Sequence, residues 1–251
     1  MTYINHRRKE KSGASSLKLN GKLCCDPTTK SNILNQPFKS AFSQRTTFTS
    51  NEFADSHRMP DADYPIIPDF KFTSNGIEKL LKCLNAHKTP RPNNLSLRLL
   101  KERSSEIAPL LHLVYQKSLD TICVPYDWRK ANVPPIYKKG PKYLAESYRP
   151  VSLTSVCCKI MEHVLARNIM RHGEDNGILY QLQHGFRRNR SCETQLIEFI
   201  DDLTKNLQEG LQTDVLIMDF AKAFDKVNHS LLVHKIHQYG IRGKVNSWIK
   251  S

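Results

Sequence analysis

Long apolar runs are missing from this sequence of 251 residues. No window approaches about 18 consecutive apolar residues, and the polar residues 1–11 contain no apolar core of a secretory signal. We therefore expect an intracellular protein without a membrane-spanning segment. Acidic residues are also scarce, because 24 Asp and Glu stand against 38 Lys and Arg, a formal net charge of +14. This excess favours nucleic acid as a partner, and a generally basic surface is the alternative.

Cysteine motifs of metal modules and disulfide frameworks are missing as well. The seven cysteines include two adjacent pairs, Cys24-Cys25 and Cys157-Cys158, and no C-x-x-C spacing occurs. An odd number of cysteines spread through a long chain argues against both kinds of site. We expect free thiols, most of them on small buried side chains.

The composition changes near residue 70. Residues 1 to about 50 carry nine Lys and Arg, two acidic residues and little apolar periodicity, and Pro60, Pro65 and Pro68 keep the next segment extended. We predict a basic, largely disordered or extended linker over residues 1–70 and a folded domain over residues 71–251.

Apolar periodicity and capping residues predict the elements of the folded domain. Strands separated by a basic turn are expected at 133–137 and 148–153. Helices are expected at about 75–87 with an Asn75/Glu78 capping box, at 105–119, at about 156–172, from the Ser191 cap to Gly210, and at 230–239.

Asp219 is the residue most suited to chemistry. The apolar run 215–218 is bounded by turn residues and predicts a strand buried on both faces, which delivers Asp219 at its end. A carboxylate there is costly to bury unless it is paired or binds a metal, and Mg²⁺ would satisfy it. On spacing alone, an Asp that caps the following turn is an equally good interpretation.

Five blocks of sequence, in order, carry a specific resemblance. Residues 219–225, Asp-Phe-Ala-Lys-Ala-Phe-Asp, resemble motif A in the reverse transcriptases of non-LTR retrotransposons, the jockey-like and related lineages. Residues 128–140 and 148–155 are similar to the two fingers motifs of that family, 183–196 to the block between fingers and palm, and 239–248 to the helix entry after motif A. The resemblance runs from about residue 70 to residue 251.

The resemblance implies an α/β fold, a partial right-hand polymerase with helix-rich fingers and the first palm strands, incomplete at the C-terminus. It implies RNA-directed DNA polymerisation, a two-metal nucleotidyl transfer in which a primer 3′-hydroxyl attacks the incoming nucleotide. The implied partners are an RNA template, a DNA primer and deoxynucleoside triphosphates, with two Mg²⁺ ions in the complete enzyme. The family's priming at chromosomal DNA implies action in the nucleus.

The resemblance also assigns roles to single residues of motif A. Asp219 matches the carboxylate that bridges the two Mg²⁺ ions, and the carbonyl of Phe220 matches an additional ligand. Phe224 matches the aromatic residue that lies under the nucleotide sugar and leaves no room for a 2′-hydroxyl. Without the resemblance, Phe224 would be interpreted as a core residue.

Basic residues outside motif A receive phosphate-binding roles. Arg149 matches the fingers arginine on the triphosphate, and Lys139 the lysine on the same phosphates, with Lys138 and Lys142 as alternatives. A solvated basic turn remains the other interpretation. Arg187, Arg188 and Arg190 surround an aromatic residue, a composition that suits the phosphate backbone and bases of template or primer. A solvated loop is an equally good interpretation.

Two departures from the family limit what we expect of this chain. Phe199-Ile200-Asp201-Asp202 spells the family's second metal motif, but it precedes motif A and lies in a helix with both carboxylates outward, so we reject it. The true Asp-Asp box, the Pro-Gln-Gly motif and the thumb are not found before residue 251. One carboxylate ligand cannot hold two ions, so we expect the chain alone to be inactive. The alternative function is a non-catalytic, nucleic-acid-binding remnant.

Overall fold

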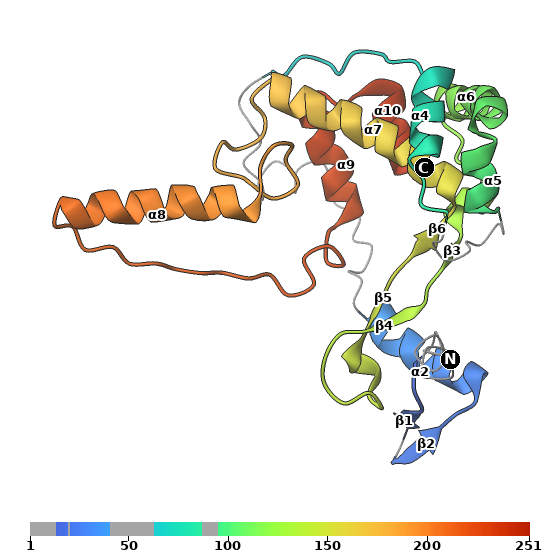
Figure 1. Ribbon diagram of the computed structural model, residues 1–251, viewed down its shortest axis with the longest axis horizontal. Coiled ribbons are helices and arrows are strands. Elements are labelled where there is room, and N and C mark those ends of the chain that lie inside the picture. Colours follow the sequence, from blue (N-terminus) through green and yellow to red (C-terminus); the bar gives the residue numbers. More distant parts are fainter. Residues whose placement is uncertain (1–13, 20, 41–62, 87–94) are drawn as a thin grey trace, which may run out of the picture.

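The computed structural model describes residues 14–19, 21–40, 63–86 and 95–251, and most of its helices form one body. Figure 1 shows α9 and α10 beside α7, and α4 between α7 and α6, with α5 at the edge of this group. The helices of this body are α4 (Ser74–Lys82), α5 (Leu97–Glu102), α6 (Ser104–Thr121), α7 (Val156–Asp175), α9 (His229–Gln238) and α10 (Gly243–Lys250).

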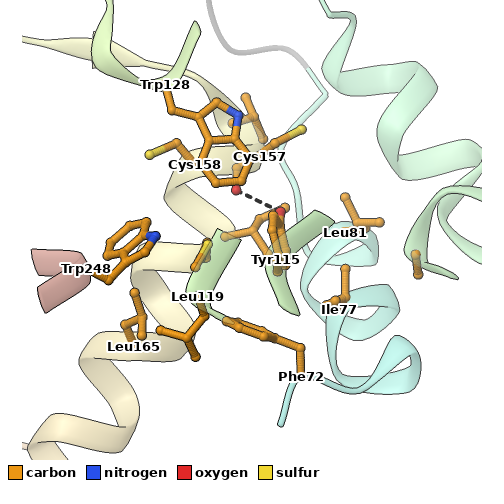
Figure 2. Close-up of a cluster of buried hydrophobic side chains, with 14 of the residues drawn as sticks. Phe72, Ile77, Leu81, Tyr115, Leu119, Trp128, Cys157, Cys158, Leu165 and Trp248 are labelled. Atoms are coloured by element: carbon orange, nitrogen blue, oxygen red, sulfur yellow. Dashed lines mark hydrogen bonds between the residues drawn. The ribbon is translucent and has the colours of Figure 1, made fainter. Parts of the chain in front are cut away.

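Tyr115 on α6 lies at the centre of the core of this body. Its ring is fully buried between Phe72 and Trp128, with ring centroids 5.4 and 5.7 Å away, and its hydroxyl donates a 2.7 Å hydrogen bond to the carbonyl of Cys157 (Figure 2). Apolar side chains from α4, α7 and α10 close around it, and each such burial stabilises the fold by about 1.5–3 kcal/mol. This core ties the segments before residue 130 to the C-terminal helix.

A two-stranded arm extends from the helical body. Strand β3 (Ala131–Asn132) pairs antiparallel with β6 (Leu153–Thr154), and β4 (Pro135–Tyr137) pairs with β5 (Tyr148–Pro150), with Ile136 opposite Arg149. The short helix η1 (Tyr126–Arg129) precedes the arm, and η2 (Ala145–Ser147) lies in the connection between β4 and β5. The predicted pair of strands around a basic turn is confirmed.

The N-terminal part of the chain is more ordered than expected. Strands β1 (Leu17–Leu19) and β2 (Lys22–Cys24) form a hairpin, and α2 (Pro27–Lys39) follows it (Figure 1). These elements share a small core with the arm, so the prediction of a largely disordered or extended linker over residues 1–70 is wrong for residues 14–19 and 21–40. Residues 63–70 have no helix or strand, but they are not a linker either, because Ile67 is buried in the core of the helical body and its N–H donates to the Gly240 carbonyl at 2.8 Å. Residues 1–13, 20 and 41–62 lie outside the described residues.

The predicted strand at 215–218 is also wrong. Helix α8 (Cys192–Gln208) projects from the body, and the segment after it returns beside it as an extended chain (Figure 1). Val215 to Met218 form no strand there, and Ile217 is 88% exposed. A buried strand needs neighbouring strands for its hydrogen bonds and an apolar layer on each face. The sheets of the described residues have two strands each, and none of them includes this run.

The other element predictions hold with small changes. Ser191 caps α8 in a reciprocal pair with Thr194, as its position predicts, and α7 and α9 form where apolar periodicity placed them. Helix α4 is shorter than the predicted 75–87, since it ends at Lys82. The predicted Asn75/Glu78 capping box is wrong, because the hydroxyl of Thr73 accepts the hydrogen bond from the Gly76 N–H. The mixture of helices and strands agrees with the α/β class.

The cysteines carry free thiols, as predicted, but the expectation that most of them are buried is wrong. Cys157 and Cys158 on α7 are buried, whereas most of the others are exposed. Burial and the neighbouring carboxylate of Glu162 raise the pKa of the Cys158 thiol to about 12, so it stays protonated and packs as a small apolar group. Within the described ranges, every helix is too short or too polar to cross a lipid bilayer.

Candidate functional site

The connection between β4 and β5 presents the predicted phosphate-binding cations. Lys138, Lys139 and Lys142 are exposed in this connection, and Arg149 is exposed on β5. Gly140 adopts a left-handed backbone with φ of 89°, and a Cβ there would come within 3.1 Å of the Ser147 hydroxyl. A glycine therefore permits the tight turn, and the Lys138 N–H donates to the Ser147 carbonyl at 2.8 Å. Four cationic groups are thus held on one short hairpin.

Asp219 lies in the extended segment after α8 and is exposed to solvent. Its partner in the motif, Asp225, is half-buried in the turn that precedes α9. Among the described residues, no group of three or more His, Cys, Asp or Glu side chains could hold a metal ion. The residues present do not fit the two Mg²⁺ ions implied by the resemblance, because one carboxylate cannot replace the water ligands of a hard divalent cation.

The turn after Asp219 presents Phe224 to solvent. Lys226 donates its N–H to the Lys222 carbonyl at 3.1 Å, and Lys222 has a φ of 55°, so the chain reverses direction here. Phe224 is 75% exposed, which excludes the core interpretation of this residue in the described structure. Its ring instead meets the ring of Phe186 edge-on, with centroids 5.8 Å apart.

The loop that carries Phe186 is held at both ends. His184 is buried, with Nδ1 2.8 Å from the Thr194 hydroxyl and Nε2 2.8 Å from the Glu198 carboxylate, so the start of the loop is fixed to α8. On the other side, Arg187 binds the carboxylate of Glu174 through two nitrogens. A hydrogen bond of 2.9 Å from Arg187 to the Tyr180 carbonyl completes this anchor.

Electrostatics agree with this geometry. The Arg187 guanidinium lowers the pKa of the Glu174 carboxyl, and Glu174 raises the pKa of Arg187. Sequence reasoning missed Glu174, His184 and Glu198, because their roles depend on contacts across 10 to 14 residues between a loop and two helices. The only local signal was the density of charged residues around the loop.

The three arginines of this loop have different surroundings. Arg187 is engaged with Glu174, and Arg190 lies 3.4 Å from Glu198 and 3.1 Å from His184. Arg188 is exposed. Two of the three guanidinium groups predicted to bind nucleic acid therefore stabilise the loop itself, and Arg188 points to solvent without this constraint. Their binding of template or primer stays a prediction.

The acidic pair in α8 is not part of the site. Asp201 and Asp202 are exposed, and Asp201 pairs with Lys205 one helical turn away at 2.5 Å. This agrees with the expectation that both carboxylates face solvent. A pocket of about 330 Å³ lies elsewhere, between α4, α5 and α7, with Leu80, Leu97 and Ile160 in its lining.

The predicted site residues therefore fall into separate groups. Phe224 and the loop of Arg187, Arg188 and Arg190 come together through the contact with Phe186. Lys139 and Arg149 lie on the arm, and among the hydrogen bonds and ion pairs described, none joins them to Asp219. Phe220, next to Asp219, is also exposed. The geometry alone provides cationic and aromatic surfaces, and it does not assemble a catalytic centre.

Comparison with known proteins shows what the chain is similar to. A family model described as reverse transcriptase (RNA-dependent DNA polymerase) matches residues 136–251. Three relatives come from Drosophila melanogaster. A probable RNA-directed DNA polymerase from transposon BS is 28% identical over 197 residues, 78% of this chain and 21% of the relative. A probable RNA-directed DNA polymerase from transposon X-element is 28% identical over 204 residues, which are 81% of this chain and 22% of the relative.

The third relative is the RNA-directed DNA polymerase from mobile element jockey, 25% identical over 170 residues, 67% of this chain and 19% of the relative. The chain thus spans about a fifth of the length of the relatives it matches. Members of this family generally use divalent metal ions. These comparisons confirm the resemblance seen in the sequence: residues 136–251 match a reverse transcriptase domain, and the three relatives are named as RNA-directed DNA polymerases of transposons or of a mobile element.

Proposed function

We propose that the chain forms the fingers and the first part of the palm of a right-hand RNA-directed DNA polymerase. The observation that carries the proposal is the β4–β5 hairpin, which holds exposed Lys139 and Arg149 inside the segment matched by the family model. The substrates are an RNA template, a DNA primer and deoxynucleoside triphosphates, and the site of action is the nucleus. The relatives' names, RNA-directed DNA polymerases of mobile elements, support this assignment.

The exposed cations of the hairpin bind the incoming triphosphate. The planar guanidinium of Arg149 suits two phosphate oxygens at once, and Lys139 contributes a point charge at the turn. Pairing with Ile136 across the hairpin holds the backbone of Arg149 in a fixed position relative to the turn. A rigid backbone beneath both cations reduces the entropy lost when they bind the phosphates.

Motif A contributes one carboxylate. Asp219 is this chain's ligand for the family's divalent metal, with the Phe220 carbonyl beside it, and Phe224 excludes a 2′-hydroxyl from the nucleotide site. In a polypeptide with further carboxylates to hold it, such an ion would supply Lewis-acid chemistry at the primer hydroxyl and the triphosphate. Because the described residues bring no other metal-binding carboxylates to Asp219, we infer that the 251-residue chain alone does not polymerise.

A second candidate function is a non-catalytic nucleic-acid-binding remnant. The observation that favours it is that cationic and aromatic side chains are exposed on the arm and the 184–190 loop, while Asp219 stands without metal-binding neighbours among the residues described. Such a protein would bind RNA and DNA through phosphates and would not turn over nucleotides.

Primer extension on an RNA template with Mg²⁺ separates the two functions. The assay uses the chain itself and the longest polypeptide that its genomic reading frame encodes. In an active polypeptide, Arg149→Ala is expected to raise KM for the nucleotide at least tenfold, because a charge-assisted contact to the triphosphate is lost. The exposed Arg98, paired with Glu102 on α5, provides the control variant Arg98→Ala. An Arg149→Ala enzyme with an unchanged KM contradicts the proposed role.

A further inference from the structure

Phe186 is presented to solvent by a backbone that is fixed on both sides of it. Its side chain is 86% exposed, and its φ of 60° is a left-handed conformation that bulky residues rarely adopt. The His184–Glu198 and Arg187–Glu174 contacts hold its neighbours, and the Arg187 N–H donates to the His184 carbonyl at 3.4 Å. The loop therefore sets where this ring lies, although burial does not compensate for the strained backbone.

The ring of Phe186 meets the ring of Phe224 in a defined geometry. The edge-on arrangement, with centroids 5.8 Å apart, is one that aromatic pairs prefer, because the positive edge of one ring meets the negative face of the other. The turn that carries Phe224 is closed by backbone hydrogen bonds from Lys226 to Lys222 at 3.1 Å and from Val227 to Phe224 at 3.3 Å. Both rings thus project from constrained backbones.

Phe224 can act in sugar selection only if its ring keeps one orientation. In the proposed function this ring occupies the space that a 2′-hydroxyl would need. An exposed side chain changes rotamer within nanoseconds, and Phe224 is 75% exposed, so its own surroundings restrain it little. The edge-on contact with Phe186 disfavours the rotamers in which the two rings separate.

We propose that Phe186 is a positioning residue for nucleotide selection, because its ring holds Phe224 in the rotamer that excludes a ribonucleotide. The inference rests on the proposed function, in which Phe224 lies under the nucleotide sugar. Phe186 acts through Phe224 and does not itself touch the nucleotide. The anchoring contacts of Arg187 and His184 contribute by fixing the backbone of the 184–190 loop.

Fluorine NMR on the 251-residue chain tests the contact without any need for activity. The chain carries para-fluorophenylalanine at position 224. Phe186→Leu keeps an apolar side chain but removes the ring, so the fluorine resonance is expected to move toward that of the free amino acid. The control is Tyr126→Leu, at a ring that is 71% exposed on η1, and it is expected to leave the resonance in place. An unchanged resonance in Phe186→Leu overturns the proposal.

Nucleotide selection is measured in the longest polypeptide that the genomic frame encodes, as kcat/KM for a deoxynucleotide divided by kcat/KM for the matching ribonucleotide. Phe186→Ala is expected to lower this preference roughly 3- to 10-fold, the range of an aromatic pair, through a lower KM for the ribonucleotide. Phe186→Tyr keeps the ring and is expected to retain the wild-type preference. A merely structural role would instead lower incorporation of both nucleotides alike, and that result contradicts the proposal.

Phe224→Ala separates this inference from the proposed function. It is expected to lower the preference more than Phe186→Ala does, and the double variant is expected to match Phe224→Ala alone, since Phe186 acts through Phe224. Additive losses in the double variant overturn the proposal. A lower preference in Phe224→Ala with an unchanged one in Phe186→Ala also overturns it and leaves the proposed function standing. An unchanged preference in Phe224→Ala contradicts the role of Phe224 in the proposed function itself.

Discussion

Phe186 and Phe224 meet edge-on, with their ring planes at 88° and their centroids 5.8 Å apart. The first belongs to the loop between α7 and α8, and the second to the turn after Asp219. Phe186 is 86% exposed and has a φ of 60°, a backbone conformation that costs a bulky residue about 1–3 kcal/mol. This contact joins the motif A segment to a loop that the Arg187–Glu174 and His184–Glu198 contacts hold in place.

The Arg187–Glu174 pair should make stability depend on pH. Glu174 has a lowered pKa in the folded state, so its contribution is present above its ordinary value of 4.5 and is lost as the pH falls through the lower, folded value. Glu174→Gln is expected to lower the melting temperature at pH 7 by a few degrees and to match the wild type below the folded pKa. Thermal melts from pH 7 to pH 3 measure this difference.

Glu193, exposed at the start of α8, provides the control for this pH series, because its pKa is lowered by hydrogen bonds with Ser191 and its own backbone. Glu193→Gln removes a carboxylate without touching the Arg187 loop. A difference for Glu174→Gln that shows no decrease as the pH is lowered, until the protein unfolds, would show that the ion pair does not stabilise the loop.

The hydroxyl of Tyr115 should stabilise the core. Burial raises the pKa of this phenol well above its ordinary value, so the group stays a neutral donor to the Cys157 carbonyl. Tyr115→Phe is expected to lower the free energy of unfolding by about 0.5–1.5 kcal/mol, because one buried hydrogen bond is lost while the Cys157 carbonyl keeps its backbone hydrogen bond within α7. Denaturant titration measures this free energy. The control is Tyr126→Phe, at a ring that is 71% exposed, and it should change the free energy of unfolding little.

Gly140 should be required for the turn at the arm tip. Gly140→Ala is expected to cost about 1–3 kcal/mol, because alanine at a φ of 89° is strained and its Cβ would crowd the Ser147 hydroxyl at 3.1 Å. Gly185→Ala is the control, since a Cβ there meets no atom within 4 Å. Equal melting temperatures for the two variants would contradict the account of this turn.

The apolar surface of α8 should limit solubility. Leu196, Ile200 and Leu207 are exposed along the helix, and the described structure buries none of the side chains of α8. Leu196→Gln/Ile200→Gln is expected to reduce aggregation at unchanged melting temperature, since no packing is lost. Size-exclusion chromatography at rising protein concentration measures the aggregation. A fall in melting temperature would instead show that this face is packed in solution.

Local signals predicted much of the helical body and the arm. Ser191 and Gly210 bracket α8 in the sequence and in the structure, and the apolar runs around Lys138 to Lys142 form the β4–β5 hairpin. Helix α2 was missed because its apolar periodicity is weak, although Asp26 followed by Pro27 is a capping signal that indicates a helix start. Propensity alone does not show what such a helix packs against.

The failed strand at 215–218 has a different cause. An apolar run specifies burial only if other segments cover it, and here the described residues supply neither paired strands nor a covering layer. The ion pair between Arg187 and Glu174 was equally invisible, because it depends on how a loop folds back on the end of α7. Candidate site residues could therefore be named from the motif order, while their contacts could not.

The most direct measurement is RNA-templated, Mg²⁺-dependent nucleotide incorporation by the longest polypeptide that the genomic frame encodes, with Asp219→Ala compared with Asp202→Ala. Asp202 is exposed on α8 and belongs to the sequence pair rejected as a metal site. The account predicts that Asp219→Ala lowers incorporation at least about 100-fold, because a metal-binding carboxylate is worth several kcal/mol in the transition state, and that Asp202→Ala leaves it unchanged. Equal incorporation by Asp219→Ala and the wild type would contradict the assignment of motif A.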